Sequence, residues 1–116
     1  MLDAEEVRRT ALSFPQVVEK QRWGHPTFDV AGRMFLTIPD DQTSFAVRCP
    51  RLERSELIAA EPDKFWVPNH EAGSSWVRAR LAALEDATEL HDIIEDSWRQ
   101  AAPEDLAAEL TSKDQR

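Results

Sequence analysis

The chain has 116 residues, the length of one domain with a single hydrophobic core. Hydrophobic residues make up 41% of it, too many for a disordered polyelectrolyte, and no apolar run approaches the roughly 20 residues that a membrane-spanning helix needs. Taken over the whole chain, the formal net charge of −8 argues against nucleic acid and anionic membranes as partners.

The acidic charge is concentrated near the C-terminus. Residues 85–116 contain ten acids and three bases, a net charge of −7, whereas residues 1–84 carry a net charge of −1. The single cysteine, Cys49, excludes an internal disulfide framework and a cysteine-rich zinc site. Residues 1–6 are acidic and contain no apolar segment of a secretory signal, so we expect a soluble cytoplasmic protein.

The first predicted element is a helix over residues 3–14. Ala4, Val7, Ala11 and Phe14 recur at helical spacing, and Asp3 supplies an N-cap. The helix is expected to end before Pro15, because the residue before a proline is disfavoured in the helical conformation.

Strands and helices then follow in an order that predicts the fold class. Alternating apolar residues and turn residues indicate strands at 17–23, 27–30, 33–38 and 43–49. We then expect a helix over 51–60, a strand over 74–82, and helices over 85–101 and 104–110. This α-β-β-β-β-α-β-α-α order predicts an α+β domain over residues 1–111, an antiparallel sheet with the N- and C-terminal helices on one face, and a frayed tail over 112–116.

Several motifs resemble the MmcQ/YjbR family. The stretch Trp23-Gly24-His25-Pro26-Thr27-Phe28-Asp29-Val30-Ala31-Gly32-Arg33-Met34-Phe35 resembles a family element in which Trp-Gly or Pro-His leads into a Phe-x-Val-x-Gly-Lys-Met-Phe hairpin. Further matches follow in order at Phe45-Ala46-Val47-Arg48, Pro68-Asn69-His70, Trp76-Val77 and Ser97-Trp98. The resemblance covers about residues 10–105.

The resemblance implies a fold like that of CyaY, the bacterial frataxin. It also implies the family's description as a DNA-binding protein with a double-wing motif, and it brings no accepted catalytic residues. This sequence departs from the family pattern at Arg33 and Arg48, where lysines are usual, and in its acidic C-terminal third.

The open face of the sheet is the first candidate site. Side chains alternate along a strand, which predicts that six side chains gather on the face that the helices leave open: Arg33, Phe35, Arg48, Trp76, Arg78 and Arg80. Guanidinium groups beside aromatic rings suit phosphate contact and base stacking. The alternative interpretation is an ordinary solvated face of a half-exposed sheet.

A cleft near the family motifs is the second candidate. It would be lined by Trp23, His25, Thr27, Trp66 and His70 and would hold a small ligand or a partner protein. Alternatively, these are loop residues whose histidines hydrogen-bond the backbone.

The remaining chemistry-bearing residues give no catalytic or metal motif. The acids Glu85, Glu89, Asp92 and Asp96 line one helix stripe, which suits either weak binding of a hard cation or a solvated helix face. Cys49 is expected to be a buried, inert thiol, and no nucleophile elbow or glycine-rich phosphate loop is present. The sequence therefore predicts a domain without catalysis, metal or cofactor that contacts DNA weakly and in a salt-dependent manner, or alternatively a protein- or ligand-binding adaptor, and no membrane partner.

Overall fold

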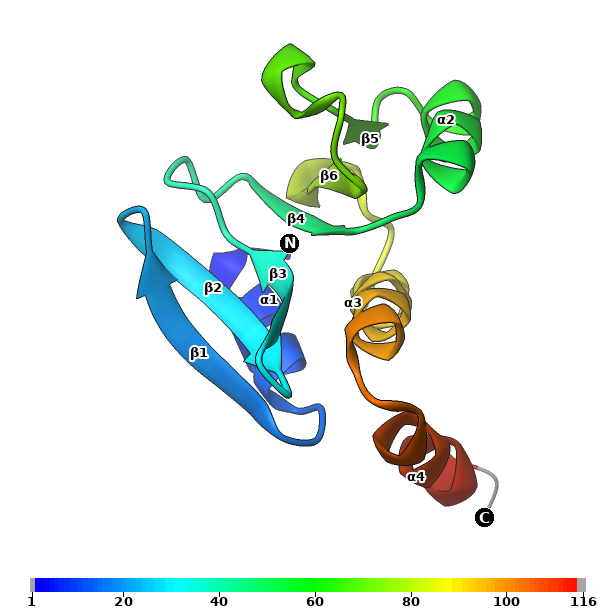
Figure 1. Ribbon diagram of the computed structural model, residues 1–116. Helices are drawn as coiled ribbons and strands as arrows, with labels where there is room; N and C mark the ends of the chain where they lie inside the picture. The colour runs from blue at the N-terminus through cyan, green and yellow to red at the C-terminus, as the bar shows by residue number, and fades with distance from the viewer. Residues whose placement is uncertain (1, 115–116) are drawn as a thin grey trace.

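The computed structural model describes residues 2–114, and of residues 111–114 it describes the backbone alone. Figure 1 labels the helices and strands. The helices are α1 (Ala4–Leu12), α2 (Arg51–Ala60), α3 (Ala87–Ala101) and α4 (Glu104–Asp114), with short 3₁₀ turns at Asn69–Glu71 and Leu81–Ala83. The strands are β1 (Val17–Arg22), β2 (His25–Val30), β3 (Arg33–Thr37), β4 (Ser44–Arg48), β5 (Phe65–Trp66) and β6 (Trp76–Arg80).

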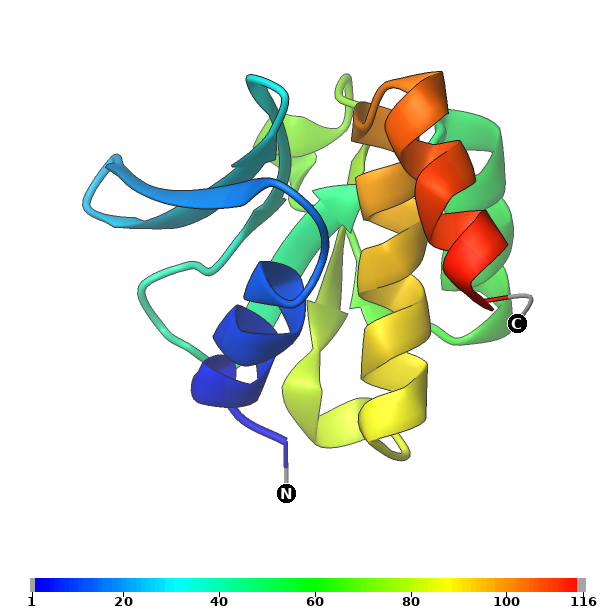
Figure 2. The same ribbon diagram turned by 90° about the horizontal axis from the view of Figure 1, so that it is seen from below.

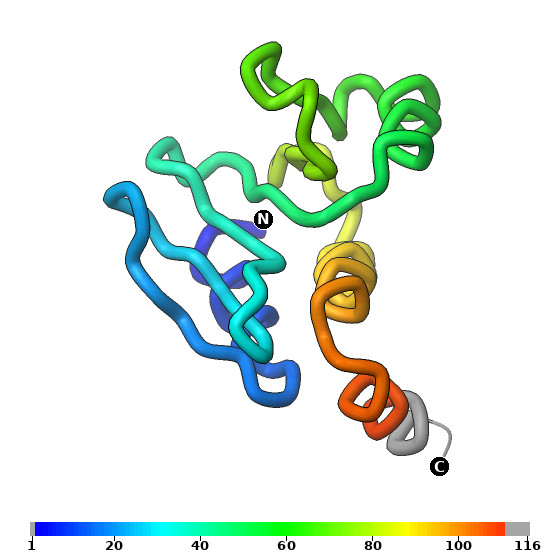
Figure 3. The backbone as a smooth tube through the Cα atoms, in the orientation of Figure 1, coloured from blue at the N-terminus to red at the C-terminus, as the bar shows by residue number. Residues whose placement is uncertain are grey.

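The described strands form one antiparallel sheet in the order β1-β2-β3-β4-β6-β5. Figure 2 shows α1 and α3 side by side across one face of this sheet. Figure 3 traces the β1–β2 hairpin along one edge and the segment 61–75, which contains β5, at the opposite edge. The predicted α+β architecture, with an antiparallel sheet and terminal helices, is therefore confirmed.

The hydrophobic core lies between the sheet and the helices on that one face. Trp98 of α3 is fully buried, and its ring stacks on Phe14 with centroids 5.7 Å apart. Other fully buried side chains of the core come from α1, the sheet and α3, among them Val7, Ala11, Phe28, Leu36, Phe45, Leu90 and Ile94. The apolar stripe of the predicted long helix is thus the side of α3 that covers the sheet.

The element boundaries agree closely with the predicted ranges. The helix α2 has the predicted bounds, and the ends of the other helices and strands shift by a few residues. The strand β5 was not predicted, because two residues are too short for an alternating pattern to appear. The expected tail begins at residue 112, within α4, and its residues 115 and 116 lie outside the described residues.

A β-bulge in β3 changes which side chains face the helices. Phe28 pairs with Leu36 and Asp29 pairs with Met34, so Phe35 is an extra residue without a partner in β2. Both Phe35 and Leu36 are fully buried in the core. Because side chains alternate along a strand, one extra residue moves every residue on its N-terminal side to the other face.

Helix α3 supplies the hydrogen bonds that the bulge removes from the sheet. The Ser97 hydroxyl donates to the Phe35 carbonyl oxygen and accepts from the Arg48 amide at 2.9 Å. The strands β3 and β4 pair only at Leu36–Val47 and Thr37–Ala46, and Ser97 lies where this pairing stops.

In the part of the chain that the structure describes, no helix is long and apolar enough to cross a membrane.

Candidate functional site

The sheet brings four of the six predicted open-face residues together. Arg48 pairs with Trp76 across β4 and β6, and the next pairs on that face are Ala46–Arg78 and Ser44–Arg80. Paired residues of an antiparallel sheet project to the same side. Arg48, Trp76, Arg78 and Arg80 therefore lie on the face opposite α1 and α3, which we call the open face.

The predictions for Arg33 and Phe35 are wrong, and the bulge explains both. Phe35 is fully buried in the core, and Met34 takes the position on the open face that the alternation assigned to Phe35. Arg33 pairs with the buried residue Val30, so it belongs to the helix-covered side of the sheet, at the exposed end of the β2–β3 hairpin.

Two arginines of the open face have no carboxylate partner among the side chains of residues 2–110. The Arg48 Nε donates to the Met34 carbonyl oxygen at 2.7 Å, and its guanidinium lies 5.8 Å from the centroid of the Trp76 ring. Burial and the nearby charge of Arg33 lower the pKa of Arg48 below its ordinary value. The Arg80 guanidinium lies 4.1 Å from the centroid of the Trp66 ring. Both cations are held against aromatic rings, which leaves their charge available to an anion.

The other cations of the open face are paired with acids. Arg78 donates to both carboxylate oxygens of Glu71. Arg22 makes two hydrogen bonds of 2.7 Å to Asp29, and Lys20 lies 3.6 Å from the same carboxylate. These contacts, led by the Arg22 hydrogen bond, hold the pKa of the buried Asp29 carboxyl below its ordinary value. On the open face, Lys20, Arg22, Arg48, Arg78 and Arg80 thus lie together with the carboxylates of Asp29 and Glu71, a basic excess among these side chains that contrasts with the acidic chain as a whole.

A cleft of about 250 Å³ lies on the open face between the β1–β2 turn and the segment 69–76. It brings Trp23 and His25 of the predicted cleft together with Trp76 and Arg78 of the predicted sheet site. The rest of its lining comes from β3, β4 and the 69–76 segment, namely Met34, Thr37, Ala46, Glu71 and Ser74. The two candidate sites of the sequence thus overlap in one place.

Three residues of the predicted cleft do not line it. Thr27 is fully buried beneath the open face, where its hydroxyl donates to the Lys20 carbonyl oxygen and accepts from Arg22. Trp66 lies under Arg80 on the far side of β6. The His70 side chain is 77% exposed and lies 3.2 Å from Glu71. The prediction was wrong for these residues because residues close to a family motif in the sequence can project to different sides of the fold.

Trp23 occupies an unfavourable position in the turn between β1 and β2. Arg22 pairs with His25, so Trp23 and Gly24 form a two-residue hairpin turn with φ values of 53° and 82°. Such turns favour asparagine or glycine at the first position, because a left-handed backbone strains residues with large side chains. The Trp23 side chain is nevertheless 72% exposed. The turn therefore holds a large aromatic ring in solvent on a backbone that strains it.

The sequence pattern did not predict a role for Arg54 of α2, although this side chain supports the cleft. Its guanidinium is buried and donates to the carbonyl oxygens of Ala72, Ser74 and Trp76 at 2.8–3.0 Å. These bonds hold the segment that carries Glu71 against the end of β6. An arginine in an amphipathic helix predicts a surface residue, and its partners lie about 20 positions away, so no local pattern reveals it.

The acidic stripe of α3 is not arranged as a metal site. Glu89 binds the buried Lys64 ammonium at 2.6 Å, and Lys64 also binds Glu61 at 2.8 Å. Burial opposes ionisation of Glu89. The hydrogen bonds that its carboxylate accepts from Lys64 and from the Glu85 backbone amide together outweigh this effect, so the pKa of Glu89 is lowered. Among the side chains that the structure describes, those of residues 2–110, no three of the His, Cys, Asp and Glu types are placed to hold a metal ion.

Comparisons with known proteins agree with this fold. The crystal structure of Deinococcus radiodurans protein DR2400, described with the domain DUF419, superposes with a TM-score of 0.70 at 20% identity, covering 84% of this chain and 77% of that chain. That similarity shows the fold alone. Among curated proteins no match was found. The family model described as YjbR matches residues 12–100, most of the chain, and so the chain belongs to the YjbR family.

Proposed function

We propose that this domain binds nucleic acid, DNA foremost, through its open face, in the cytoplasm and without catalysis. The single observation that carries the proposal is the pairing of cations with aromatic rings on that face. Arg48 lies beside Trp76, and Arg80 lies over Trp66, with neither guanidinium bound to a carboxylate of the described chain. Arginine contacts phosphate, and exposed aromatic rings stack on bases.

The dimensions of the cleft favour an unpaired base. Its volume of about 250 Å³ is below the roughly 300–1000 Å³ that ordinary small-ligand pockets occupy. Trp23 and Trp76 both line it, so a flat group entering the cleft meets aromatic surfaces. Bases within a duplex are stacked on each other, whereas those of a single strand are free to enter such a site. We therefore expect single-stranded DNA to bind better than duplex DNA.

A protein- or ligand-binding adaptor is the second candidate, and it would use the same cleft. It is favoured by the exposed Trp23 ring, because aromatic anchors are enriched in protein interfaces. The two functions differ in their response to salt. Phosphate contacts release counterions, so nucleic-acid affinity falls steeply as salt rises, whereas an aromatic anchor changes little.

The test is fluorescence anisotropy with a labelled oligothymidine and the matching duplex, titrated from roughly 20 to 200 mM salt. The double variant Arg78→Ala with Arg80→Ala should reduce the slope of log affinity against log salt by about 0.7 for Arg80, which has no carboxylate partner, and by less for Arg78, which is paired with Glu71. The matched control is Arg9→Ala with Arg51→Ala, which removes the same charge from exposed positions on α1 and α2 and should leave the slope unchanged.

Two results would overturn the nucleic-acid proposal. One is the absence of binding to either oligonucleotide at the lowest salt. The other is an equal change of slope in both double variants, which would show a response to net charge alone.

A further inference from the structure

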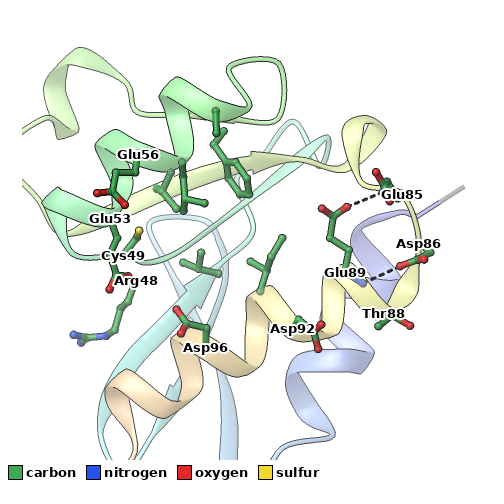
Figure 4. Close-up of a pocket in the computed structure, with 16 residues that line it drawn as sticks. Arg48, Cys49, Glu53, Glu56, Glu85, Asp86, Thr88, Glu89, Asp92 and Asp96 are labelled. Atoms are coloured by element: carbon green, nitrogen blue, oxygen red, sulfur yellow. Dashed lines mark hydrogen bonds between the residues drawn. The ribbon is translucent and has the colours of Figure 1, made fainter.

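A second concave surface lies on the helix side of the molecule, away from the open face. It is a groove of about 770 Å³ between α2 and α3, closed at its base by the ends of β4, β5 and β6. Figure 4 shows side chains from α2 and α3 facing each other across it. The base and inner walls are apolar and consist of Val47, Cys49, Leu57, Phe65, Val77 and Ile93.

The rim of the groove is strongly acidic. Carboxylates line both sides, from α2, from α3 and from the segment before α3: Glu53, Glu56, Glu85, Glu89, Asp92 and Asp96. Of these, Glu89 alone is bound to a lysine or arginine of the described chain. Asp86 also lines the groove and caps α3 by accepting from the Glu89 amide at 2.9 Å.

No cation of the groove itself balances these acids. Arg48 is the basic residue among the lining side chains, and its Nε is bound to the Met34 carbonyl oxygen. Figure 4 shows its guanidinium directed away from the centre of the groove. Lys64 is committed to Glu61 and Glu89. An occupant must therefore bring positive charge to the rim and apolar surface to the base.

We infer that this groove binds a basic amphipathic helix of another protein. The spacing from Asp86 to Asp96 spans about 15 Å along α3, close to three helical turns. A small cation would meet one or two of the carboxylates, whereas a helix of matching length meets the whole rim with lysines or arginines. Its apolar side chains would enter the groove, as in other helix-in-groove complexes.

The partner is not a second copy of this chain. The helices α1 and α2 contain as many acids as bases, and α3 and α4 contain more acids than bases. None of them offers the basic face that the rim requires, and a second acidic helix would be repelled. Charge complementarity thus assigns the groove to a different protein, and the inference does not depend on the proposed function of the open face.

The probe is a fluorescein-labelled helical peptide of lysine and leucine, about 14 residues long, with leucine at positions i, i+3, i+4 and i+7. The groove variant carries Glu53→Gln, Glu56→Gln and Asp92→Asn. The matched control carries Glu104→Gln, Asp105→Asn and Glu109→Gln, which remove the same charge from exposed positions of α4. We expect about a tenfold loss of peptide affinity in the groove variant and less than a twofold loss in the control.

A third variant tests the apolar base without changing charge. Leu57→Ala should weaken binding of the peptide severalfold, because Leu57 forms part of the inner wall. Circular dichroism confirms that each variant is folded. A second peptide with serine in place of leucine keeps the charge, and it should bind at least tenfold more weakly.

The inference is overturned if the two triple variants lose affinity equally, or if the serine peptide binds as tightly as the leucine peptide. Either result would show attraction to net charge alone. Failure of the lysine–leucine peptide to bind at low salt would overturn it as well. The Arg78→Ala and Arg80→Ala variant should bind the peptide normally, so a failure of the open face and a failure of the groove are distinguishable.

Discussion

The Ser97 hydroxyl of α3 donates a hydrogen bond to the carbonyl oxygen of Phe35, 62 positions earlier in the chain. Phe35 is the extra residue of the β3 bulge, and its carbonyl oxygen has no partner in a regular ladder there. The same hydroxyl accepts from the Arg48 amide. One buried serine therefore fixes the place where β3 and β4 separate, and with it the face on which Met34 and Arg48 emerge.

Replacement of this serine should destabilise the fold. Ser97→Ala leaves a buried carbonyl oxygen and a buried amide without their partner, which costs about 1–3 kcal/mol of unfolding free energy. Urea denaturation measures the change. The control is Ser55→Ala, whose exposed hydroxyl bonds its own helix, and the expected change there is below about 0.5 kcal/mol. Equal midpoints for the two variants would contradict this role of Ser97.

The buried Arg54 guanidinium should be equally sensitive. Arg54→Met retains most of the side-chain volume but leaves three carbonyl oxygens without their hydrogen-bond donor. We therefore expect the unfolding free energy to fall by about 2–4 kcal/mol and amide exchange to become faster over residues 72–76. Arg51→Met, one turn earlier on the exposed side of α2, should change the unfolding free energy by less than about 0.5 kcal/mol. Unchanged exchange over 72–76 in Arg54→Met would show that other contacts hold this segment.

Stability should depend on pH through Asp29. Its folded pKa lies below the unfolded value of about 3.9, so the stabilisation is present above that value and is lost as the pH falls through the folded pKa. Asp29→Asn should cost about 2 kcal/mol at pH 7 and progressively less below about pH 4. Urea midpoints measured between about pH 7 and 2 provide the check, with the exposed Asp63→Asn as control. A pH-independent difference would mean that Asp29 acts through packing.

Trp23 should show opposite effects on stability and on binding. Trp23→Asn places a favoured residue at φ 53° and should raise the unfolding free energy by about 1 kcal/mol, while weakening oligonucleotide binding by removal of the exposed ring. Gly24→Ala, at φ 82°, should instead lower stability by about 1 kcal/mol. A destabilised Trp23→Asn variant would indicate that the ring packs within the fold.

The sequence predicted the fold because its main signals are local. The stripe of Leu90, Ile94 and Trp98 predicted the face of α3 that covers the sheet, and turn residues separated the first four strands. Arg48, Trp76, Arg78 and Arg80 were assigned to the correct face because β4 and β6 pair without a bulge.

The site was predicted less well, because it depends on contacts between distant segments. Met34, Phe35 and Leu36 are three consecutive apolar residues, so the pattern itself does not reveal the bulge that sends Met34 outward and Phe35 inward. The hydrogen bonds by which Arg54 supports the cleft depend on how α2 packs against the sheet. The meeting of acids from α2 and α3 at the rim of the groove depends on the same packing. The contacts of Arg54 leave no periodic trace in the sequence, whereas the α3 side of the rim does, as the stripe of Glu85, Glu89, Asp92 and Asp96.

Arg48 connects the two faces of this small domain. Its guanidinium lies beside Trp76 on the open face, while the residue also lines the groove between α2 and α3. A cationic helix in the groove would cancel negative potential within roughly one or two Debye lengths of that guanidinium. The two binding events would then share a coupling free energy, and each ligand would raise the affinity of the other by the same factor. Such a domain would respond to the joint presence of an anionic strand and a basic protein, rather than to either of them alone.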